Sequence, residues 1–462
     1  MSLESENAEL RQLVAQQIEL IASLSLEIEQ LKARILELEN QKKVNSKNSS
    51  NPPSGDCFKS NLTLRTPSNK KPGGQKGHQG YNLPLSDNPD EVIPLRAETC
   101  TECGTSLSQV EPQKVIRRQV VDLSGEKPLK VTEYRSEILV CPSCGKKTGG
   151  TFPSHLKSSM EYGPNISGLL MLMVHTHALP YKRVADLIHE ILGAKISPGT
   201  IVNITKACAK ASSEPVETVL NTLKSAPVLH LDETGLRVEG KTLWVHSACT
   251  ASDSHLILSE SRGSKGIDLH LKDYQGTAIH DGWKSYFKYD CTHGLCNAHH
   301  LRELKFLFEI QGYIWAKEFF DLLCSTYRRT KDDGIIPEEE QEKIRNRARE
   351  ILVKAKAAHP PPEPVPEKKR GRVKRSKALN LINRLEKFTE SVWLFITDPN
   401  IPFDNNQAER DLRMLKVMIK IKGCFRTMEG AMQHLTIRSL IQSVQKKGQN
   451  ILSALTNTMA TA

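Results

Sequence analysis

The chain has 462 residues and a formal net charge of +11, with 38% hydrophobic and 25% charged residues. This length exceeds one ordinary domain, so about two to four folded units are expected. The longest apolar run, ISGLLMLMV, is far shorter than the roughly 20 residues that cross a bilayer, and no charged-then-apolar leader opens the chain. We therefore expect a soluble protein without a membrane span. The 11 cysteines, an odd number, favour a reducing compartment over a disulfide scaffold.

The first 43 residues carry an unbroken heptad pattern. Its two seam positions hold Asn7, Val14, Ile21, Ile28 and Ile35, and Leu3, Leu10, Gln17, Leu24, Leu31 and Leu38. β-Branched residues at one seam position with leucine at the other favour a parallel two-stranded coil, and opposite charges flank the seam. Residues 1–43 are therefore predicted to form a coiled coil that makes a homodimer or a larger oligomer. The alternative is a helix that packs on its own domain.

A stretch rich in Ser, Asn and Pro follows the heptads, and the basic sequence GGQKGHQG comes after it. Such a composition cannot build a core, so residues 44–90 are predicted to be a flexible basic linker. Residues 41–78 hold eight basic residues and one acidic residue, which favours a polyanionic partner.

Two CxxC pairs follow, Cys100 with Cys103 and Cys141 with Cys144, and each pair precedes a glycine. A CxxC turn directs two thiolates at one ion, so two such turns complete a tetrahedral Cys₄ site. The residues between the pairs alternate as strands do. A zinc ribbon is therefore predicted over residues 91–160. Its closed shell of four thiolates would make the Zn²⁺ structural, and a redox pair is the alternative.

Residues 161–224 are predicted to be helical. Within them, two apolar-periodic stretches flank a short turn from Gly193 to Pro198. Ser197 suits the N-cap of the second helix, and Pro198 suits its first turn. A helix-turn-helix with a recognition helix from Gly199 is therefore predicted to contact DNA, although helical hairpins with Gly and Pro at the corner are common.

Two acidic residues stand at the ends of predicted strands. Residues 227–260 alternate like antiparallel strands and contain Asp232 in the sequence HLDETG. A helical stretch and the strand GTAIH follow, and Asp281 comes directly after that strand. This is the order of an RNase H-like core, which places Asp232 and Asp281 at neighbouring strand ends. Glu233 is an alternative to Asp232, and Asp281 could be a simple turn residue.

A third acid, Glu409, lies in a basic helix predicted to begin after Asp404 and Asn405, both good capping residues. From the pattern alone, Asp404 and Asp411 are rivals of Glu409. The basic residues of this helix that are predicted to place DNA phosphates are Arg410, Arg413 and Lys416.

Three carboxylates in a basic chain indicate phosphodiester chemistry. Two Mg²⁺ (or Mn²⁺) ions roughly 4 Å apart activate the attacking oxygen and stabilise the leaving oxygen, and these hard cations prefer oxygen ligands. Asp232 is expected to bridge both ions, with Asp281 and Glu409 each completing one coordination shell. The separation of Asp281 from Glu409 is longer than a minimal core needs, so residues 311–395 are predicted to be a helical insertion.

The insertion contains the basic run KKRGRVKRSK, in which seven of ten residues are Lys or Arg. A run of this kind is either a solvated linker or a loop that grips DNA. The residues predicted to contact DNA are Lys369, Arg370, Arg372, Lys374 and Arg375.

Together the motifs resemble the bacterial insertion-sequence transposases of the IS sixty-six group, which belong to the DDE superfamily. The motifs that carry this resemblance span nearly the whole chain: NSSNPPS, GGQKGHQG, the paired CxxC, HLDETG, HDGW, CNAHHLREL and DNNQAERDLR. The resemblance implies that Asp232, Asp281 and Glu409 are the metal-binding triad, which chooses among the rival acids. It also implies that Cys296 and His299 belong to a family motif, for which packing is favoured over a second metal site.

The resemblance implies a DDE-type transposase, a polynucleotidyl transferase that uses two metal ions to cut and join the ends of its element. Its expected partners are double-stranded DNA, both the terminal inverted repeats and the target, and accessory proteins of the same element. Its expected location is the prokaryotic cytoplasm, at the nucleoid. The alternatives are a zinc-containing DNA-binding regulator with an inert RNase H-like core, and an RNase H-like nuclease.

The predicted fold class is a multidomain chain of α+β and α/β type. Its expected parts are a coiled coil over 1–43, a linker over 44–90, a zinc ribbon over 91–160, a helical DNA-binding segment over 161–224, an RNase H-like core over 225–310 and 396–440, a helical insertion over 311–395, and a C-terminal helix or tail over 441–462.

Overall fold

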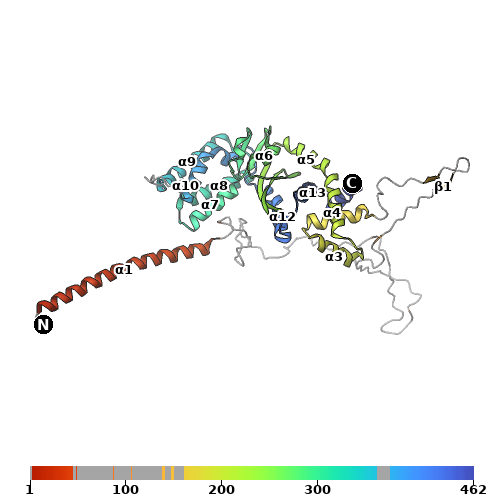
Figure 1. Cartoon of the computed structure of the whole chain (residues 1–462). Coiled ribbons are helices and arrows are strands. Elements are labelled where there is room, and N and C mark those ends of the chain that lie inside the picture. Colours follow the sequence, from red (N-terminus) through yellow and green to blue (C-terminus); the bar gives the residue numbers. More distant parts are fainter. Residues whose placement is uncertain are drawn as a thin grey trace. The chain divides into compact units, whose positions relative to one another are not determined.

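The computed structural model of the protein describes residues 3–44, 161–361 and 375–462, the short segments 138–140 and 147–149, and the single residues Asn48, Asp87, Ser106 and Leu129 (Figure 1). The chain divides into two compact units. One unit contains Met1–Phe58 and Ser154–Ala462, and the other contains Lys59–Pro153. Among the described residues, no helix is long and apolar enough to cross a membrane.

The N-terminal helix α1 spans Leu3–Lys43 and is drawn red in Figure 1. Its described seam residues remain 44% to 63% exposed in the single chain, with Leu38 at the lower limit and Ile21 at the upper. A long apolar stripe at this exposure is typical of a helix that pairs with another helix. The pairing itself stays a prediction, because one chain is described.

A five-stranded mixed sheet forms the centre of the larger unit, in the order β5-β4-β3-β6-β7. The strands are β3 (Val228–Val238), β4 (Lys241–Cys249), β5 (Ser254–Ser259), β6 (Thr277–His280) and β7 (Thr292–Leu295). The first three pair antiparallel, whereas β6 pairs parallel with β3 and β7 pairs parallel with β6. The predicted strand order is confirmed in this coarse form, and β7 is an additional edge strand.

The tight turn between β3 and β4 follows from its two residues. Glu239 and Gly240 have φ values of +51° and +75°. Two consecutive positive φ values match the right-handed twist of the flanking strands, and glycine accepts such a value at no steric cost. The turn fixes the register of the hairpin, in which Asp232 lies opposite Ser247.

Helices cover both faces of the sheet. On one face, α12 (Asn406–Lys422) and α13 (Met428–Lys446) bury Leu412, Leu415 and Leu435 against Leu236 and Val245. On the other face, the apolar residues of α5 (Ser213–Lys224) and α6 (Ser264–Leu271) share a core with residues of β3 and β4, namely Leu223, Ile267, Leu271, Leu229, Leu231 and Ala248. Because side chains alternate along a strand, even-numbered residues of β3 face α12 and odd-numbered residues face α6.

A second core joins the helices before the sheet to the end of the chain. Its helices are α2 (Pro164–Met171), η2 (Leu172–Thr176), α3 (Tyr181–Leu192), α4 (Pro198–Ala211) and α14 (Ile451–Ala460). Helix α3 ends at Gly193, which is left-handed with φ +69°. Helix α4 begins at Pro198 and is capped by Ser197, whose Oγ accepts a hydrogen bond from Thr200 N at 3.0 Å. The two-helix corner has the predicted caps, and its contact with DNA stays a prediction.

A third core lies in the helices between the sheet and α12. These are α7 (Asn297–Glu309), α8 (Ile314–Asp332), α9 (Glu338–Ala358), α10 (Lys377–Lys387), α11 (Thr389–Trp393) and the short η4 (Leu394–Ile396). Leu301, Leu304 and Leu307 of α7 pack in this core beside Phe319 and Trp393. Helix α7, which precedes the predicted insertion, packs in the same core, and the bounds 311–395 of the insertion stay a prediction.

In the smaller unit, β1 (Ile138–Val140) and β2 (Lys147–Gly149) pair antiparallel, with Leu139 opposite Thr148. In the sequence these strands stand on either side of the second CxxC pair. The four predicted zinc ligands lie outside the described residues, so the zinc ribbon stays a prediction.

Candidate functional site

The pairing of β3 with β6 brings the first two acids side by side, one in the middle of β3 and one just after the end of β6. His230 lies opposite Ile279. Asp232 comes two residues after His230, and Asp281 comes two residues after Ile279. Asp281 follows the last residue of β6, and its Oδ1 accepts a hydrogen bond from Trp283 N at 2.8 Å. The register therefore makes these two carboxylates neighbours. Asp281 stands at a strand end as predicted, whereas Asp232 lies in the middle of β3, which continues to Val238, so its predicted position at a strand end is wrong.

Helix α12 brings the third acid close to Asp232. Asn405, just before its first residue, fastens the helix to β3, because its Nδ2 donates to Leu231 O at 2.6 Å and its Oδ1 lies 2.9 Å from His230 Nδ1. Glu409 lies in the first turn of α12. The helix packs on the face of β3 to which Asp232 belongs, so Glu409 approaches Asp232 from above the strand.

The electrostatics of Asp232 reflect this gathering of acids. Burial raises the pKa of Asp232 to about 7, and the negative charges of Glu233, Asp281 and Glu409 add to the rise. Carboxylates held this close resist joint ionisation unless a cation lies between them. Three carboxylates from two strands and one helix are therefore a donor set suited to hard divalent cations.

Glu233, the rival of Asp232, belongs to the opposite face of β3. Its carboxylate is 2.7 Å from Arg262 Nη2 and accepts a hydrogen bond from Tyr286 OH at 2.5 Å. Arg262 in turn lies over the ring of Trp283, 3.9 Å from its centroid. Glu233 thus has two protein partners of its own beneath the sheet.

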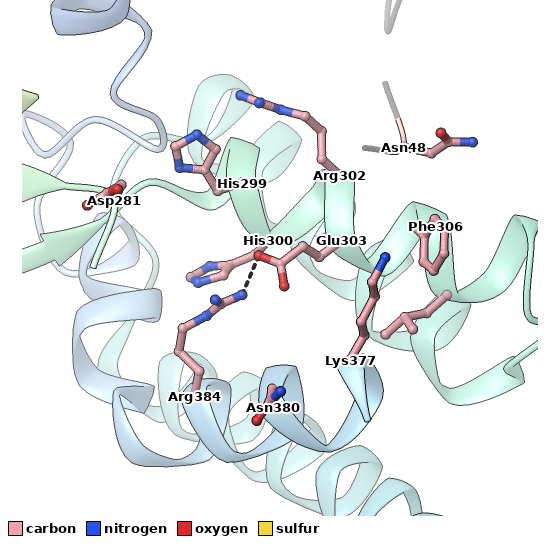
Figure 2. Close-up of a pocket in the computed structure, with 11 residues that line it drawn as sticks. Asn48, Asp281, His299, His300, Arg302, Glu303, Phe306, Lys377, Asn380 and Arg384 are labelled. Carbon is pink, nitrogen blue, oxygen red and sulfur yellow. Dashed lines mark hydrogen bonds and ion pairs between the residues drawn. The ribbon is translucent and has the colours of Figure 1, made fainter. Parts of the chain in front are cut away.

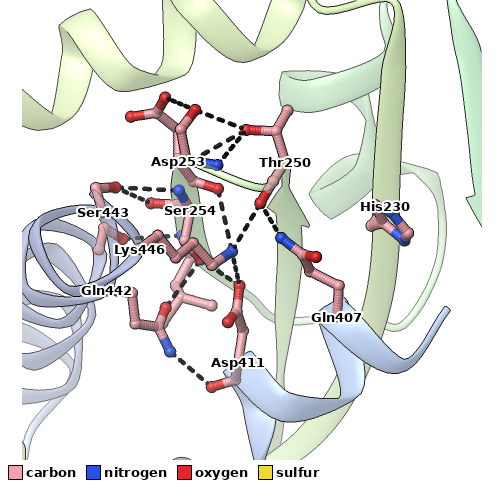
Figure 3. A network of polar contacts seen from close by, with 12 residues as sticks. His230, Thr250, Asp253, Ser254, Gln407, Asp411, Gln442, Ser443 and Lys446 are labelled. Carbon is pink, nitrogen blue, oxygen red and sulfur yellow. Dashed lines mark hydrogen bonds and ion pairs between the residues drawn. The ribbon is translucent and has the colours of Figure 1, made fainter. Parts of the chain in front are cut away.

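The rivals of Glu409 also have other partners. Asp404 Oδ1 accepts a hydrogen bond from Asn406 N at 3.0 Å, as a capping residue does. Asp411 is buried and lies 2.6 Å from Lys446 Nζ (Figure 3). The same carboxylate accepts a hydrogen bond from Ser254 Oγ at 2.7 Å. Asp411 therefore belongs to a buried polar network that joins α12, α13 and the start of β5.

Comparison with family models shows the family of the chain. A family model described as "Transposase IS66 family" matches residues 159–433, more than half of the chain. The chain belongs to the IS66 transposase family. A second model, for a family of unknown function (DUF6444), matches residues 2–84. A search of the curated proteins finds no match.

His299 and Arg302 of the transposase hold Glu409 from the side of α7. His299 Nε2 lies 3.2 Å and Arg302 Nη2 lies 3.3 Å from Glu409 Oε1. The hydrogen bond from His299 lowers the pKa of Glu409, and the charge of Arg302 adds to this effect. No sequence pattern signals this contact directly, because it depends on how α7 packs beside α12.

The sulfur of Cys296 completes a group of three possible metal ligands with His299 and Glu409, whose ligand atoms lie within 4.8 Å of one another. Cys296 Sγ is buried and accepts a hydrogen bond from Asn405 N at 3.1 Å. The guanidinium of Arg302 already contacts the same Glu409 oxygen. Burial raises the pKa of the Cys296 thiol to about 12. Because the thiolate is the form that binds metals, this group is better suited to positioning Glu409 than to binding a second metal.

The predicted DNA-binding residues are partly described. Arg410, Arg413 and Lys416 of α12 are all exposed, as is Arg375 before α10. The other predicted contacts of the basic run, Lys369, Arg370, Arg372 and Lys374, lie outside the described residues, as do the cysteines Cys100, Cys103, Cys141 and Cys144.

Proposed function

We propose that this transposase cuts and joins DNA at a two-metal site formed by Asp232, Asp281 and Glu409. The proposal is supported by the proximity of three carboxylates, one from the middle of β3, one just after β6 and one from the first turn of α12. The rival acids are engaged elsewhere: Glu233 with Arg262 and Tyr286, and Asp411 with Lys446. The negative charges of Asp281 and Glu409 both raise the pKa of Asp232, which supports the grouping of these three acids.

The donor set fits Mg²⁺ or Mn²⁺, because it offers carboxylate oxygens from three separate elements. When bound, two such ions activate the attacking water or 3′-hydroxyl and stabilise the leaving oxygen. Asp232, between its two partners, would contact both ions, and Asp281 and Glu409 would each complete one shell. His299 and Arg302 would keep the Glu409 carboxylate turned toward the site.

Exposed cations beside the triad would hold the DNA backbone. Arg410, Arg413 and Lys416 project from the helix that carries Glu409. Phosphate contacts of this kind set the register of DNA without reading its sequence. Sequence reading would fall to the corner of α3 and α4, whose second helix begins with a Ser cap and a Pro.

We also propose the assembly around this core. Cys100, Cys103, Cys141 and Cys144 would bind a structural Zn²⁺, supported by their spacing and by the hairpin of β1 and β2 around the second pair. The exposed seam of α1 would pair two or more chains. The transposase would act on its element's ends and a target duplex in the prokaryotic cytoplasm, with accessory proteins of the same element.

A strand-transfer assay tests the proposed chemistry. Labelled element ends are incubated with the protein and Mg²⁺, and Asp232→Asn is compared with Asp290→Asn, which changes an exposed acid outside the triad. The Asp232→Asn protein should lose cleavage and joining on the order of a thousandfold or more, whereas Asp290→Asn should keep both. Equal joining by the wild type and Asp232→Asn would refute the assignment.

A further inference from the structure

A pocket of about 490 Å³ opens beside the triad and extends between α7 and α10. Asp281 and His299 line one end of it, and Phe306 and Lys377 line the other (Figure 2). The pocket therefore begins at two residues of the carboxylate site and leads away from it. Its far end lies in the helical insertion, which the proposed chemistry does not use.

The charges along this pocket favour an anion. Arg384 and Glu303 neutralise each other at 2.6 Å, and Arg302 is shared with Glu409. Lys377 is different, since among the described residues no carboxylate forms an ion pair with its Nζ. Lys377 is also the first residue of α10, and the N-terminus of a helix adds partial positive charge.

An aromatic ring lies next to this cation. Lys377 Nζ is 4.4 Å from the centre of the Phe306 ring, and Phe306 is only partly buried. A cation for the phosphate and a ring for the base are the two elements with which proteins hold single-stranded nucleic acid. The volume is within the range of sites that enclose one small ligand, roughly 300–1,000 Å³, which suits a nucleotide and excludes a duplex.

We propose that this pocket binds the single strand that continues past the scissile phosphate, an inference that rests on the proposed function. The scissile phosphate lies at the triad, and the next nucleotide enters between α7 and α10. Its phosphate contacts Lys377 and its base stacks on Phe306.

Binding of oligothymidylate to the full-length protein without divalent metal tests the pocket. A fluorescent strand of about eight nucleotides and a blunt duplex are compared by anisotropy. Lys377→Glu and Phe306→Ala should each weaken binding of the strand by about tenfold and change duplex binding little. Lys354→Glu is the matched control, because it reverses an exposed charge on α9 outside the pocket. Phe306→Leu keeps the apolar packing and should also weaken binding of the strand.

The proposal would be refuted if Lys377→Glu and Lys354→Glu lost the same affinity for the single strand. It would also be refuted if the pocket variants lost the same affinity for the duplex as for the strand. Photocrosslinking gives a second readout, since a strand with 5-iodouracil should attach to the peptide that contains Phe306; attachment confined to α12 would also overturn it. The Asp232→Asn protein separates the two proposals. It should bind the strand normally while losing joining, so retained joining would refute the triad and leave the pocket intact.

Discussion

Asp232 and Glu233 are neighbours in the chain and have different roles because a strand alternates its side chains. Asp232 faces α12, and Glu233 faces Arg262 and Tyr286 on the other side of the sheet. The HLDETG sequence predicts a strand end at these acids, but β3 continues to Val238. The face on which each acid lies depends on which layer of helices covers which side of the sheet. The choice of Glu409 needed the family resemblance, since Asp404 and Asp411 fit the local pattern equally well.

The contact of His299 with Glu409 was not predictable from the pattern. These residues belong to α7 and α12, and the helical insertion separates them in sequence. Their approach is set by tertiary hydrogen bonds, such as Asn297 N to Phe403 O at 3.1 Å and Asn405 N to Cys296 Sγ at 3.1 Å. A periodic sequence pattern predicts which face of a helix is buried, but it does not predict hydrogen bonds between separate elements.

For single residues, we predict that Glu409→Gln abolishes most strand-transfer activity and that Asp404→Asn retains it. The glutamine cannot carry the negative charge that a metal ligand needs, so strand transfer should fall on the order of a thousandfold. The Asp404→Asn protein should keep the capping hydrogen bond to Asn406 N, because asparagine caps helices as well as aspartate does. Strand-transfer rates with labelled ends provide the measurement, and similar activity of the two variants would contradict the choice of Glu409.

At the scale of elements, α12 is fastened to the sheet at two points. Asn405 holds its start to β3, and Asp411 with Lys446 holds its second turn to α13. Lys446 Nζ also donates to Thr250 O and Asp253 O at 3.1 and 3.2 Å, which ties both helices to the turn before β5 (Figure 3). This network therefore fixes the position of Glu409 relative to Asp232 and Asp281.

Breaking the buried pair should therefore loosen α12. Asp411→Asn leaves the Lys446 charge without its partner, and removing one member of a buried ion pair costs about 3–5 kcal/mol. The control is Asp186→Asn, because Asp186 pairs with Lys182 at the surface. This substitution should lower the free energy of unfolding by less than about 1 kcal/mol. Urea unfolding of both variants measures the difference, and a loss in Asp411→Asn as small as that of the control would contradict the role of the network.

The N-terminal helix gives a second prediction for an element. Because its apolar seam stays 44% to 63% exposed in one chain, we predict that the full-length protein is a dimer and that deletion of residues 1–43 gives a monomer. Light scattering after gel filtration measures the mass. The truncated protein should retain the thermal transition of its core, and an unchanged oligomeric state would contradict the coiled coil.

At the scale of the whole molecule, the sheet collects acids that lie far apart in sequence. The strand order could be predicted from alternation and turn residues, as the three antiparallel strands and the parallel β6 show. The edge strand β7 reads Thr-His-Gly-Leu, so it offers an interior glycine and one large apolar residue in place of an alternating pattern. The inclusion of α7 in the helical layer depends on its packing against α8. Long-range packing thus determines the edge strand and the packing of α7, which the local sequence pattern does not predict.

Buried histidines give the molecule a predicted pH dependence. Burial lowers the pKa values of His175, His255, His270, His280, His300 and His434. A histidine whose pKa is lower in the folded state contributes stability above pH 6.5 that is lost as the pH falls, because the unfolded chain then binds more protons. Asp232 acts in the opposite direction, since its raised pKa removes stability as the pH rises toward about 7.

We therefore expect the metal-free core to lose stability between pH 7.5 and pH 5.5. Each proton taken up on unfolding contributes about 1.4 kcal/mol per pH unit. The six histidines outnumber the two acids whose pKa values are raised by burial, Asp232 and Glu233. All four tryptophans lie in residues 161–462, so their fluorescence in urea follows the unfolding of this part of the chain. A free energy of unfolding that is constant or rises on acidification would contradict this account.

The most direct test of the central claim is to locate the ions. Crystals of the transposase with an element end and Mn²⁺, measured at the manganese absorption edge, should show two anomalous peaks roughly 4 Å apart. Asp232 should contact both peaks, and Asp281 and Glu409 should contact one each. A single peak at Cys296 and His299, or peaks that persist unchanged in Asp232→Asn crystals, would contradict the two-metal triad.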